Sequence, residues 1–128
     1  MDAARLGFVP DSVIQELGWD DDVDEDLRVA IEKTTGNHIV DGDFGDVADG
    51  VILWWRDDEG DLIDALVDCL HDLDDGGSVW VFTPKVGREG HVEPADIAEA
   101  AEVAGLSTTT TTTASQDWSA TKLSTRKR

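Results

Sequence analysis

Residues 51–85 read VILWWRDDEGDLIDALVDCLHDLDDGGSVWVFTPK, and they carry the clearest signal of fold class in the chain. Its two apolar runs, at 51–55 and 79–82, are continuous, which is typical of strands buried on both faces of a sheet. Between them four leucines recur at helical spacing, at Leu62, Leu66, Leu70 and Leu73. We expect Gly76-Gly77 to turn the chain from this helix into the second strand. The stretch therefore predicts a β-α-β unit, which requires parallel strands covered by helices.

The residues before this unit predict a further strand and a helix. The segment 13–17 reads VIQEL, a short alternating run that is typical of a strand. A helix is expected over 24–34, because Asp24 is a favourable N-cap and Gly36 is a typical stop. The segment 38–42 (HIVDG) is a weaker strand candidate, and the acidic residues that follow it are expected to form a loop or a short helical turn.

The residues after the unit complete the sheet. Pro94 fits the first turn of a helix that ends near Gly105. The threonine run 108–113 is β-branched and follows that helix, so we interpret it as a strand. Residues 118–124 alternate between apolar and polar and predict a last strand, which pairs antiparallel with the threonines through a turn near 115–117.

The order of these elements predicts an α/β fold of three layers, α/β/α, in which a mostly parallel sheet ends in an antiparallel hairpin. We expect residues 1–125 to form a single domain and the basic tail 126–128 to be disordered. Residues 51–125 follow the plan of a class I methyltransferase domain. The whole chain resembles a truncated, Rossmann-like version of that domain.

The turn that would hold a methyltransferase cofactor lacks the expected glycines. A glycine-rich turn after the first strand lets the backbone approach such a ligand closely. Here the turn reads ELGWDDDVD, with Gly18 alone, the bulky Trp19 and a run of aspartates. Asp41 is placed to contact a ribose, but one aspartate in a chain with 29 acidic residues is weak evidence. We therefore expect no cofactor and no catalytic residue, and a regulator or adaptor rather than an enzyme.

The acidic runs do not match a metal-binding pattern. Windows that start at Asp20, Asp41 and Asp57 lack the glycine at position 6 and the glutamate at position 12 of a calcium-binding EF-hand loop. The three histidines are far apart and Cys69 is the only cysteine, so no zinc spacing is present. A lone cysteine in an apolar helix predicts a buried side chain, and it suits a reducing cytoplasm.

The negative charge of the chain is concentrated in its N-terminal part. Residues 1–77 carry 23 acidic and 4 basic side chains, a net charge of −19, whereas residues 78–128 carry 6 of each, a net charge of zero. Such a potential repels nucleic acid and attracts a basic protein surface. Alternatively, the charge only keeps a small protein soluble. No apolar run reaches the roughly 18 residues of a membrane span and no secretory signal is recognisable, so we expect a cytoplasmic protein without a membrane partner.

Two groups of residues are candidates for ligand or partner contacts. The first comprises Trp19, Asp20, Asp21, Asp22 and Asp24, in which an indole inside an acidic collar would anchor a basic partner. The second comprises Thr83, Pro84, Lys85 and Arg88, which would form an anion or small-ligand site at the carboxyl ends of the strands. Alternatively, the two cations of this group neutralise nearby aspartates. Self-association through an edge strand or the threonine hairpin is a further hypothesis.

Four long segments carry a more specific likeness: VIQELGWDDDVDEDLR, VILWWRDDEGDLIDALVD, WVFTPKVGREGHVEPADIAEAAEVAGL and DWSATKL. In this order they resemble an actinobacterial family of small acidic proteins, domain-of-unknown-function family 3052 (DUF3052). The likeness covers nearly the whole chain. It implies a cytoplasmic protein with a methyltransferase-like α/β fold, and it carries over no catalytic residue.

Overall fold

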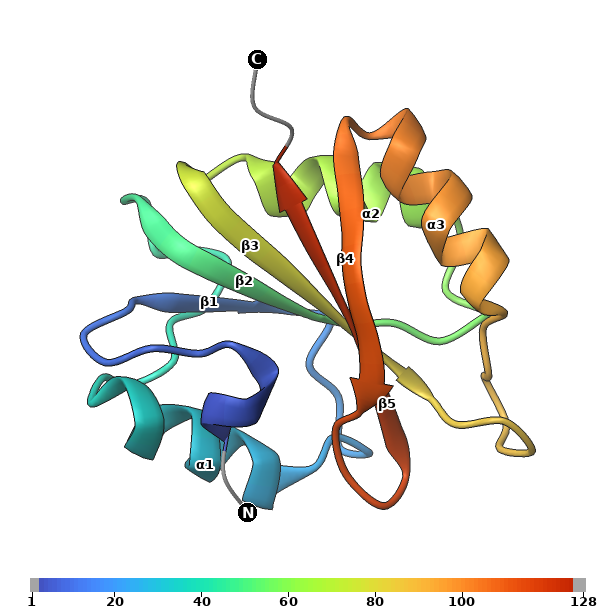
Figure 1. Cartoon of the computed structure of the whole chain (residues 1–128), viewed down its shortest axis with the longest axis horizontal. Coiled ribbons are helices and arrows are strands. Elements are labelled where there is room, and N and C mark those ends of the chain that lie inside the picture. Colours follow the sequence, from blue (N-terminus) through green and yellow to red (C-terminus); the bar gives the residue numbers. More distant parts are fainter. Residues whose placement is uncertain (1–2, 126–128) are drawn as a thin grey trace.

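The structure is a computed structural model that describes residues 3–125. Its elements follow one another in the order η1-β1-α1-β2-α2-β3-α3-β4-β5 (Figure 1). The helices are the short 3-10 helix η1 (Ala3–Leu6), α1 (Glu25–Thr35), α2 (Leu62–Leu70) and α3 (Pro94–Val103). The strands are β1 (Ile14–Leu17), β2 (Ala48–Trp54), β3 (Leu73–Pro84), β4 (Leu106–Thr113) and β5 (Trp118–Thr125).

The five strands form one mixed sheet in the order β1-β2-β3-β5-β4. Strands β1, β2 and β3 are parallel, whereas β5 is antiparallel to both of its neighbours, β3 and β4. This confirms the predicted mostly parallel sheet with a terminal antiparallel hairpin. Because β5 is inserted between β3 and β4, it is β4 that lies at the edge of the sheet.

Helices cover both faces of the sheet, which confirms the three layers (Figure 1). On one face Leu27 of α1 joins a core that contains Trp54, and on the other Leu66 of α2 and Ile97 of α3 join a core that contains Trp55. The neighbours Trp54 and Trp55 belong to opposite cores because successive side chains of a strand point to opposite faces. Burial of each large apolar side chain stabilises the fold by roughly 1.5–3 kcal/mol.

Local signals set the helix ends close to where the sequence predicts them. The carboxylate of Asp24 accepts a hydrogen bond from the main-chain N–H of Leu27 (3.1 Å), which caps the first turn of α1. Gly36 ends α1 with a left-handed φ of 79° and donates its N–H to the carbonyl oxygen of Glu32. Pro94 lies in the first turn of α3, as predicted. A side-chain N-cap such as Asp24 contributes about 1 kcal/mol.

The segment 38–42 is not a strand, which corrects one prediction. Only Val40 forms a parallel bridge to β1, where it donates its N–H to Ile14 O (2.9 Å) and accepts from Glu16 N–H (2.8 Å). The glycine- and aspartate-rich residues that follow favour turns over an extended ladder, so the chain leaves the sheet edge here. The predicted loop is also shorter than expected, since β2 already begins at Ala48.

Gly76 and Gly77 lie inside β3 and do not form the predicted turn. Helix α2 ends at Leu70 and Leu73 already belongs to β3, so the helix is shorter than the leucine spacing predicts. A Cβ on Gly77 would lie 2.7 Å from the carbonyl oxygen of Asp49. Glycine is therefore required where the starts of β2 and β3 approach closely, a need that local sequence patterns do not distinguish from a turn.

The predicted disorder of 126–128 lies outside the described residues. Among residues 3–125, the helices are too short and too polar for any of them to traverse a lipid bilayer.

Candidate functional site

The carboxyl ends of β1 and β2 meet where the chain changes direction within the sheet. From β1 the chain passes through α1 to the Val40 bridge on one side of β1, and it then returns to form β2 on the other side. Open α/β sheets bind their ligands at such a switch point, outside the carboxyl ends of the strands. Gly18 follows β1 at this point, and Trp55 and Arg56 follow β2.

Gly18 is held against β2. Its φ is +77°, and a Cβ at this position would lie 2.3 Å from the carbonyl oxygen of Trp54. Only glycine allows both the left-handed conformation and this close approach. The lone glycine of the turn thus serves the packing of β1 against β2, which differs from the role that a glycine has in approaching a cofactor.

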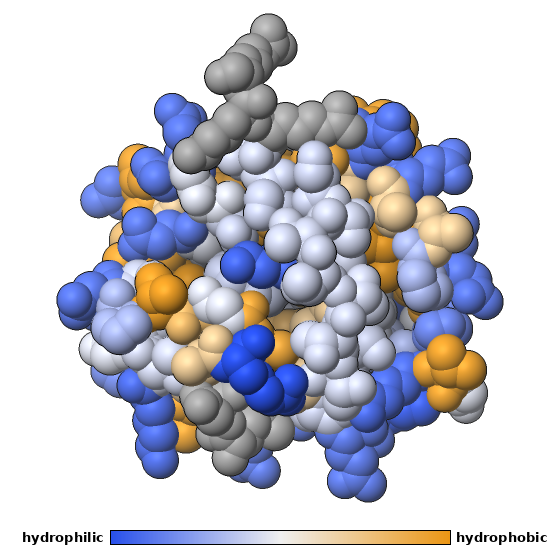
Figure 2. All heavy atoms as spheres, in the orientation of Figure 1, coloured by the Kyte–Doolittle hydropathy of each residue, from blue (hydrophilic) through white to orange (hydrophobic). Residues whose placement is uncertain are grey.

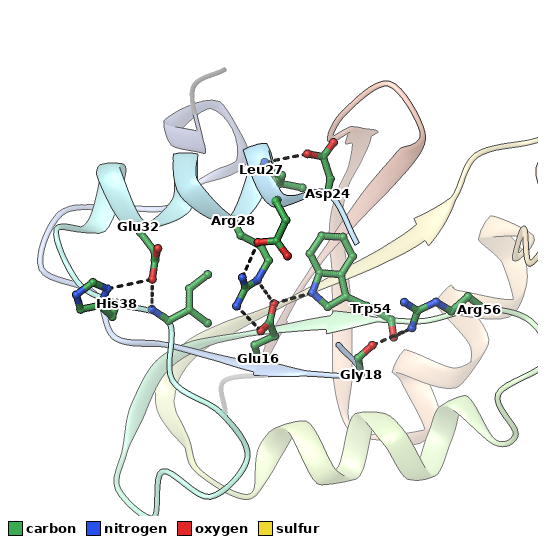
Figure 3. Close-up of polar contacts among 11 residues, drawn as sticks. Glu16, Gly18, Asp24, Leu27, Arg28, Glu32, His38, Trp54 and Arg56 are labelled. Atoms are coloured by element: carbon green, nitrogen blue, oxygen red, sulfur yellow. Dashed lines mark hydrogen bonds and ion pairs between the residues drawn. The ribbon is translucent and has the colours of Figure 1, made fainter. Parts of the chain in front are cut away.

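The guanidinium of Arg56 lies at the switch point, against Gly18 and Trp54 (Figure 3). Arg56 is only 8% exposed, and its Nη1 donates to the carbonyl oxygens of Gly18 (2.8 Å) and Trp54 (3.2 Å). Nη1 also donates to Glu59 Oε1 (3.0 Å), while Nε and Nη2 donate to the two carboxylate oxygens of Asp22. All three nitrogens of the guanidinium therefore have acceptors from this chain.

The surroundings of Arg56 keep it charged. Burial by itself works to lower the pKa of Arg56, but the hydrogen bonds that it donates to Asp22 and Glu59 outweigh burial and raise the pKa. The guanidinium also lies over the ring of Trp118, at 5.4 Å from the ring centroid, which is a favourable cation–π distance. Arg56 therefore acts as a permanent charged link between the ends of β1 and β2.

A second ion pair links β1 to α1 (Figure 3). The carboxylate of Glu16, whose side chain is 7% exposed, accepts hydrogen bonds from Arg28 Nε (2.7 Å), Arg28 Nη2 (2.9 Å) and the indole N–H of Trp54 (2.9 Å). Arg28 also donates to Glu25 (2.8 Å). These bonds, chiefly the one to Glu16, raise the pKa of Arg28. The two-pronged geometry is the strong form of such a pair, and it serves the attachment of α1 to the sheet.

An open acidic cleft of about 620 Å³ lies beside Arg56. It is lined by residues from the turn after β1, the loop after β2 and the loop after β3, namely Asp20, Asp22, Arg56, Asp58, Glu59, Arg88, Glu89 and Gly90. Five of these residues are acidic and two are basic, a net charge of −3. Arg88 is paired with Asp117 (Nη1–Oδ2 3.2 Å), as Arg56 is with its carboxylates. Because both cations are paired, the cleft presents a negative surface.

The structure brings members of both groups of predicted contact residues to this cleft, namely Asp20, Asp22 and Arg88. Trp19, next to Asp20 in the chain, is 54% exposed, whereas the other four tryptophans are at most 8% exposed. Asp21, which follows Trp19 and Asp20 in the chain, is also exposed. Asp24 is the exception in its group, since its carboxylate is used as the N-cap of α1.

The rest of the second group lies elsewhere. Thr83 and Pro84 are buried within β3 and belong to its ladder with β5. Lys85 is half-buried and its main-chain N–H donates to Asp117 O (3.1 Å). Of this group only Arg88 lines the cleft, where its ion pair with Asp117 matches the alternative that these cations neutralise nearby aspartates.

Sequence reasoning missed the residues that hold this site together, which are Glu16, Arg28, Arg56 and Glu59. A signal was present for two of them. Glu16 lies in an apolar strand and Arg56 directly follows VILWW, and charged side chains in such surroundings are almost never buried unless they are paired. Their partners were not readable, because Gly18 and Arg56 are 38 positions apart.

A smaller cavity of about 260 Å³ lies next to Gly18, between the ends of β1 and β2 and helix α2, and its lining includes Trp55, Ala65 and Asp68. It is below the roughly 300–1,000 Å³ of typical small-molecule sites. Within residues 3–125, no group of three or more His, Cys, Asp and Glu side chains is placed to hold a metal ion.

Solved methyltransferases share this architecture. Magnesium protoporphyrin IX methyltransferase (ChlM) from Synechocystis PCC 6803, solved with bound SAM, has a TM-score of 0.60 at 13% identity, over 96% of this chain and 74% of that chain. An O-methyltransferase (NcsB1) from neocarzinostatin biosynthesis, solved with S-adenosylmethionine, has a TM-score of 0.67 at 18% identity. That match covers 98% of this chain and 51% of NcsB1, so this chain spans about half the length of that protein. At these identities the likeness shows the fold, and it confirms the methyltransferase-like architecture.

Relatives are also evident from the sequence. The chain is 50% identical over 121 residues to an uncharacterized protein of Mycobacterium tuberculosis strain H37Rv (Rv2239c) and to one of Mycobacterium bovis (Mb2263c). Each alignment covers 94% of this chain and 76% of the relative. Residues 3–127 match the family described as "Protein of unknown function (DUF3052)". These matches show that the chain belongs to the DUF3052 family.

Proposed function

We propose that this protein is a non-catalytic regulator or adaptor that binds a basic segment of a partner protein in the acidic cleft. One observation carries the proposal: both arginines of the cleft are paired with carboxylates of this chain. Each guanidinium of the cleft thus already has a carboxylate partner in this chain, and the residues that line the cleft keep a net charge of −3. Clefts of one charge sign concentrate their field and attract ligands of the opposite sign.

Trp19 gives the cleft an apolar contact as well as a charge. Its indole is 54% exposed and lies directly before Asp20 in the chain. An exposed indole face attracts a Lys or Arg side chain by about 0.5–1 kcal/mol, and tryptophan is enriched among the residues that dominate binding energies. A basic segment would thus meet both carboxylates and an aromatic face at the same mouth.

The switch point itself supports a non-catalytic role. Arg56 occupies it with bonds to Gly18 O and Trp54 O, and Gly18 lies against Trp54 with no room for a side chain. A nucleoside ligand at this point would have to displace a buried charge from its partners, which typically costs several kcal/mol.

The test compares two triple variants in protein capture from a lysate of the source organism. The cleft variant is Asp20→Asn, Asp58→Asn and Glu89→Gln, which neutralises exposed carboxylates that Arg56 does not use. The control variant, with the same change in charge, is Asp96→Asn, Glu99→Gln and Glu102→Gln on exposed positions of α3. A specific partner should be retained by the wild type and the α3 variant and lost by the cleft variant.

Two outcomes contradict the proposal. One is a set of partners that both triple variants retain equally. The other is thermal stabilisation of the wild type by S-adenosylmethionine or a nucleotide, since a ligand at about 100 times its Kd adds roughly 2.7 kcal/mol to the stability of the protein that binds it. The second outcome would favour the alternative function, a small-ligand-binding protein or an enzyme.

A further inference from the structure

Strand β4 forms an exposed edge of the sheet without a charged residue. It reads LSTTTTTT, it pairs with β5 on one side, and every residue after Leu106 is exposed. Figure 2 shows a largely neutral surface over β4 and β5, with strongly hydrophilic side chains gathered mainly around its margin. Natural edge strands are commonly protected by charged residues, and β4 has none although the net charge of the chain is −19.

Part of this edge directs its main-chain groups toward solvent. Ala114 donates its N–H to Trp118 O (3.0 Å), so the main chain at Ala114 faces β5. Along an antiparallel strand, residues that bond to the neighbouring strand alternate with residues whose main-chain groups point away from it. The N–H and C=O of Thr111 and Thr113 therefore face away from β5. Arg5 agrees with this direction, since its Nη1 donates to Thr113 O (2.6 Å). Arg5 covers that end of the edge, so Thr111 lies at the centre of the open part.

We propose that two copies of this chain associate through antiparallel pairing of their β4 edges, centred near Thr111. The result is one continuous sheet across both copies. Antiparallel pairing about a twofold axis is self-complementary, because each strand offers the other the same donors and acceptors. Threonine is well suited to it, since it is β-branched and Thr–Thr pairs across neighbouring strands are favourable.

The charge distribution favours this edge over the opposite one. Strand β1 belongs to residues 1–77, with a net charge of −19, whereas β4 belongs to residues 78–128, with a net charge of zero. Since β1 and β4 are the two ends of the five-stranded order, pairing through β4 separates the two β1 strands by about 43 Å, at roughly 4.8 Å for each of nine spacings. That is several times the Debye length of about 8 Å. Pairing through β1 would bring the acidic halves together instead.

Two features limit the strength of the association. The register of the β4–β5 ladder shifts between Thr108 and Thr110, which is a bulge that ends regular pairing on one side of Thr111. Arg5 covers the other side. A contact of this length falls among interfaces that bury less than about 1,200 Å², which are typically weak and transient. We therefore expect a dimer that depends on protein concentration.

Sedimentation equilibrium between about 10 µM and about 1 mM protein tests the proposal, since this range brackets weak dissociation constants. The average mass should rise from the 13.9 kDa of one chain toward twice that value. Salt should strengthen the association, because screening weakens the remaining repulsion between acidic copies. Binding of a basic partner in the cleft should instead weaken as salt is added. Because the two proposals predict opposite salt responses, either one can fail while the other holds.

Three single variants address the contact itself. Thr111→Pro removes an N–H that the ladder with β5 does not use, and Thr111→Glu and Thr111→Lys place like charges opposite each other across the twofold axis. Each should weaken the association at least about tenfold, an effect of about 1.4 kcal/mol. Val29→Lys on α1, at a position that is 46% exposed, is the control and should leave the association unchanged.

A general electrostatic effect between copies would respond in opposite directions to Thr111→Glu and Thr111→Lys. The proposed contact should be weakened by both variants, so the pair separates the two explanations. Circular dichroism and urea unfolding establish that each variant is folded as the wild type is. A wild type that stays monomeric up to about 1 mM would overturn the proposal. So would a dimer that all three folded Thr111 variants retain.

Discussion

Replacing Arg56 by methionine isolates the hydrogen bonds of its guanidinium. Methionine keeps an unbranched apolar side chain beside Trp118, but it offers no donor to the carbonyl oxygens of Gly18 and Trp54. It also leaves the carboxylate of Asp22 without its partner. We expect a clear loss of stability, because a buried acceptor without a donor costs more than the bond itself contributed.

The magnitude follows from the burial of each partner. The contact with Trp54 O is buried, so its loss should cost about 1–3 kcal/mol, whereas water from the cleft can reach Gly18 O and reduce the loss there. Asp22 is 49% exposed, and solvent screening limits its pair to about 0–1 kcal/mol. Glu59 keeps a hydrogen bond from the main-chain N–H of residue 56 (2.9 Å). The Trp54 and Asp22 contributions together come to about 1–4 kcal/mol, and the solvated Gly18 O adds a smaller loss.

Urea unfolding followed by tryptophan fluorescence and circular dichroism measures this loss as a difference in the free energy of unfolding. Arg88→Met is the matched control, because Arg88 is also paired with a carboxylate but both partners are about half exposed. It should change the free energy by no more than about 0.5 kcal/mol. Arg56→Lys should fall between the two, since one ammonium group cannot reach both carbonyls and Asp22 in the fork geometry of arginine.

Equal losses for Arg56→Met and Arg88→Met would contradict this prediction, because the two arginines would then be equivalent surface charges. Added salt gives an independent check. At about 0.5 M salt the small effect of Arg88→Met should vanish, while most of the Arg56→Met loss should remain, since it comes from buried hydrogen bonds and not from exposed charges.

Three further predictions concern other buried or paired groups. Arg28→Met should lower the free energy of unfolding by about 2 kcal/mol because it leaves the buried carboxylate of Glu16 short of partners, and adding Glu16→Gln should recover part of that loss in a double-mutant cycle. Burial raises the pKa of the Cys69 thiol to about 12, so a thiol reagent at pH 8 should modify Cys69 only after unfolding. The free energy of unfolding should fall as the pH rises from about 9 toward 12, because the thiol ionises in the unfolded chain before it ionises in the folded one. The hydrogen bond from Gln15 and the neighbouring histidine hold the pKa of Asp72 below its usual value, so the stability contributed by this carboxylate should be lost as the pH falls through that lowered pKa. Carbon NMR titration should show an Asp72 pKa that moves back toward the normal value in Gln15→Ala; an unchanged titration would contradict this assignment.

The helices and the strand order along the chain were largely predictable, because their signals lie within a few residues of each other. Asp24 and Gly36 mark the ends of α1 from neighbouring positions, and the alternation of residues 118–124 needs only its own side chains to be recognised. The exposure of Trp19 was predictable for the same reason, since it lies between a glycine and a run of aspartates. The same local view failed at Gly77, where the reason for glycine is a neighbouring strand.

The α/β class, the methyltransferase-like order of elements and the concentration of negative charge before residue 78 are all readable from the residue order alone. Three other features depend on how the chain packs: Arg56 crosses from β2 to the end of β1, Arg88 pairs with Asp117, and β4 becomes an open edge. The difference is one of range. Periodicity, capping and turn chemistry act between residues that are adjacent along the backbone, whereas the partner of a buried charge and the neighbour of a strand are chosen by how distant segments pack, which depends on the whole sheet at once.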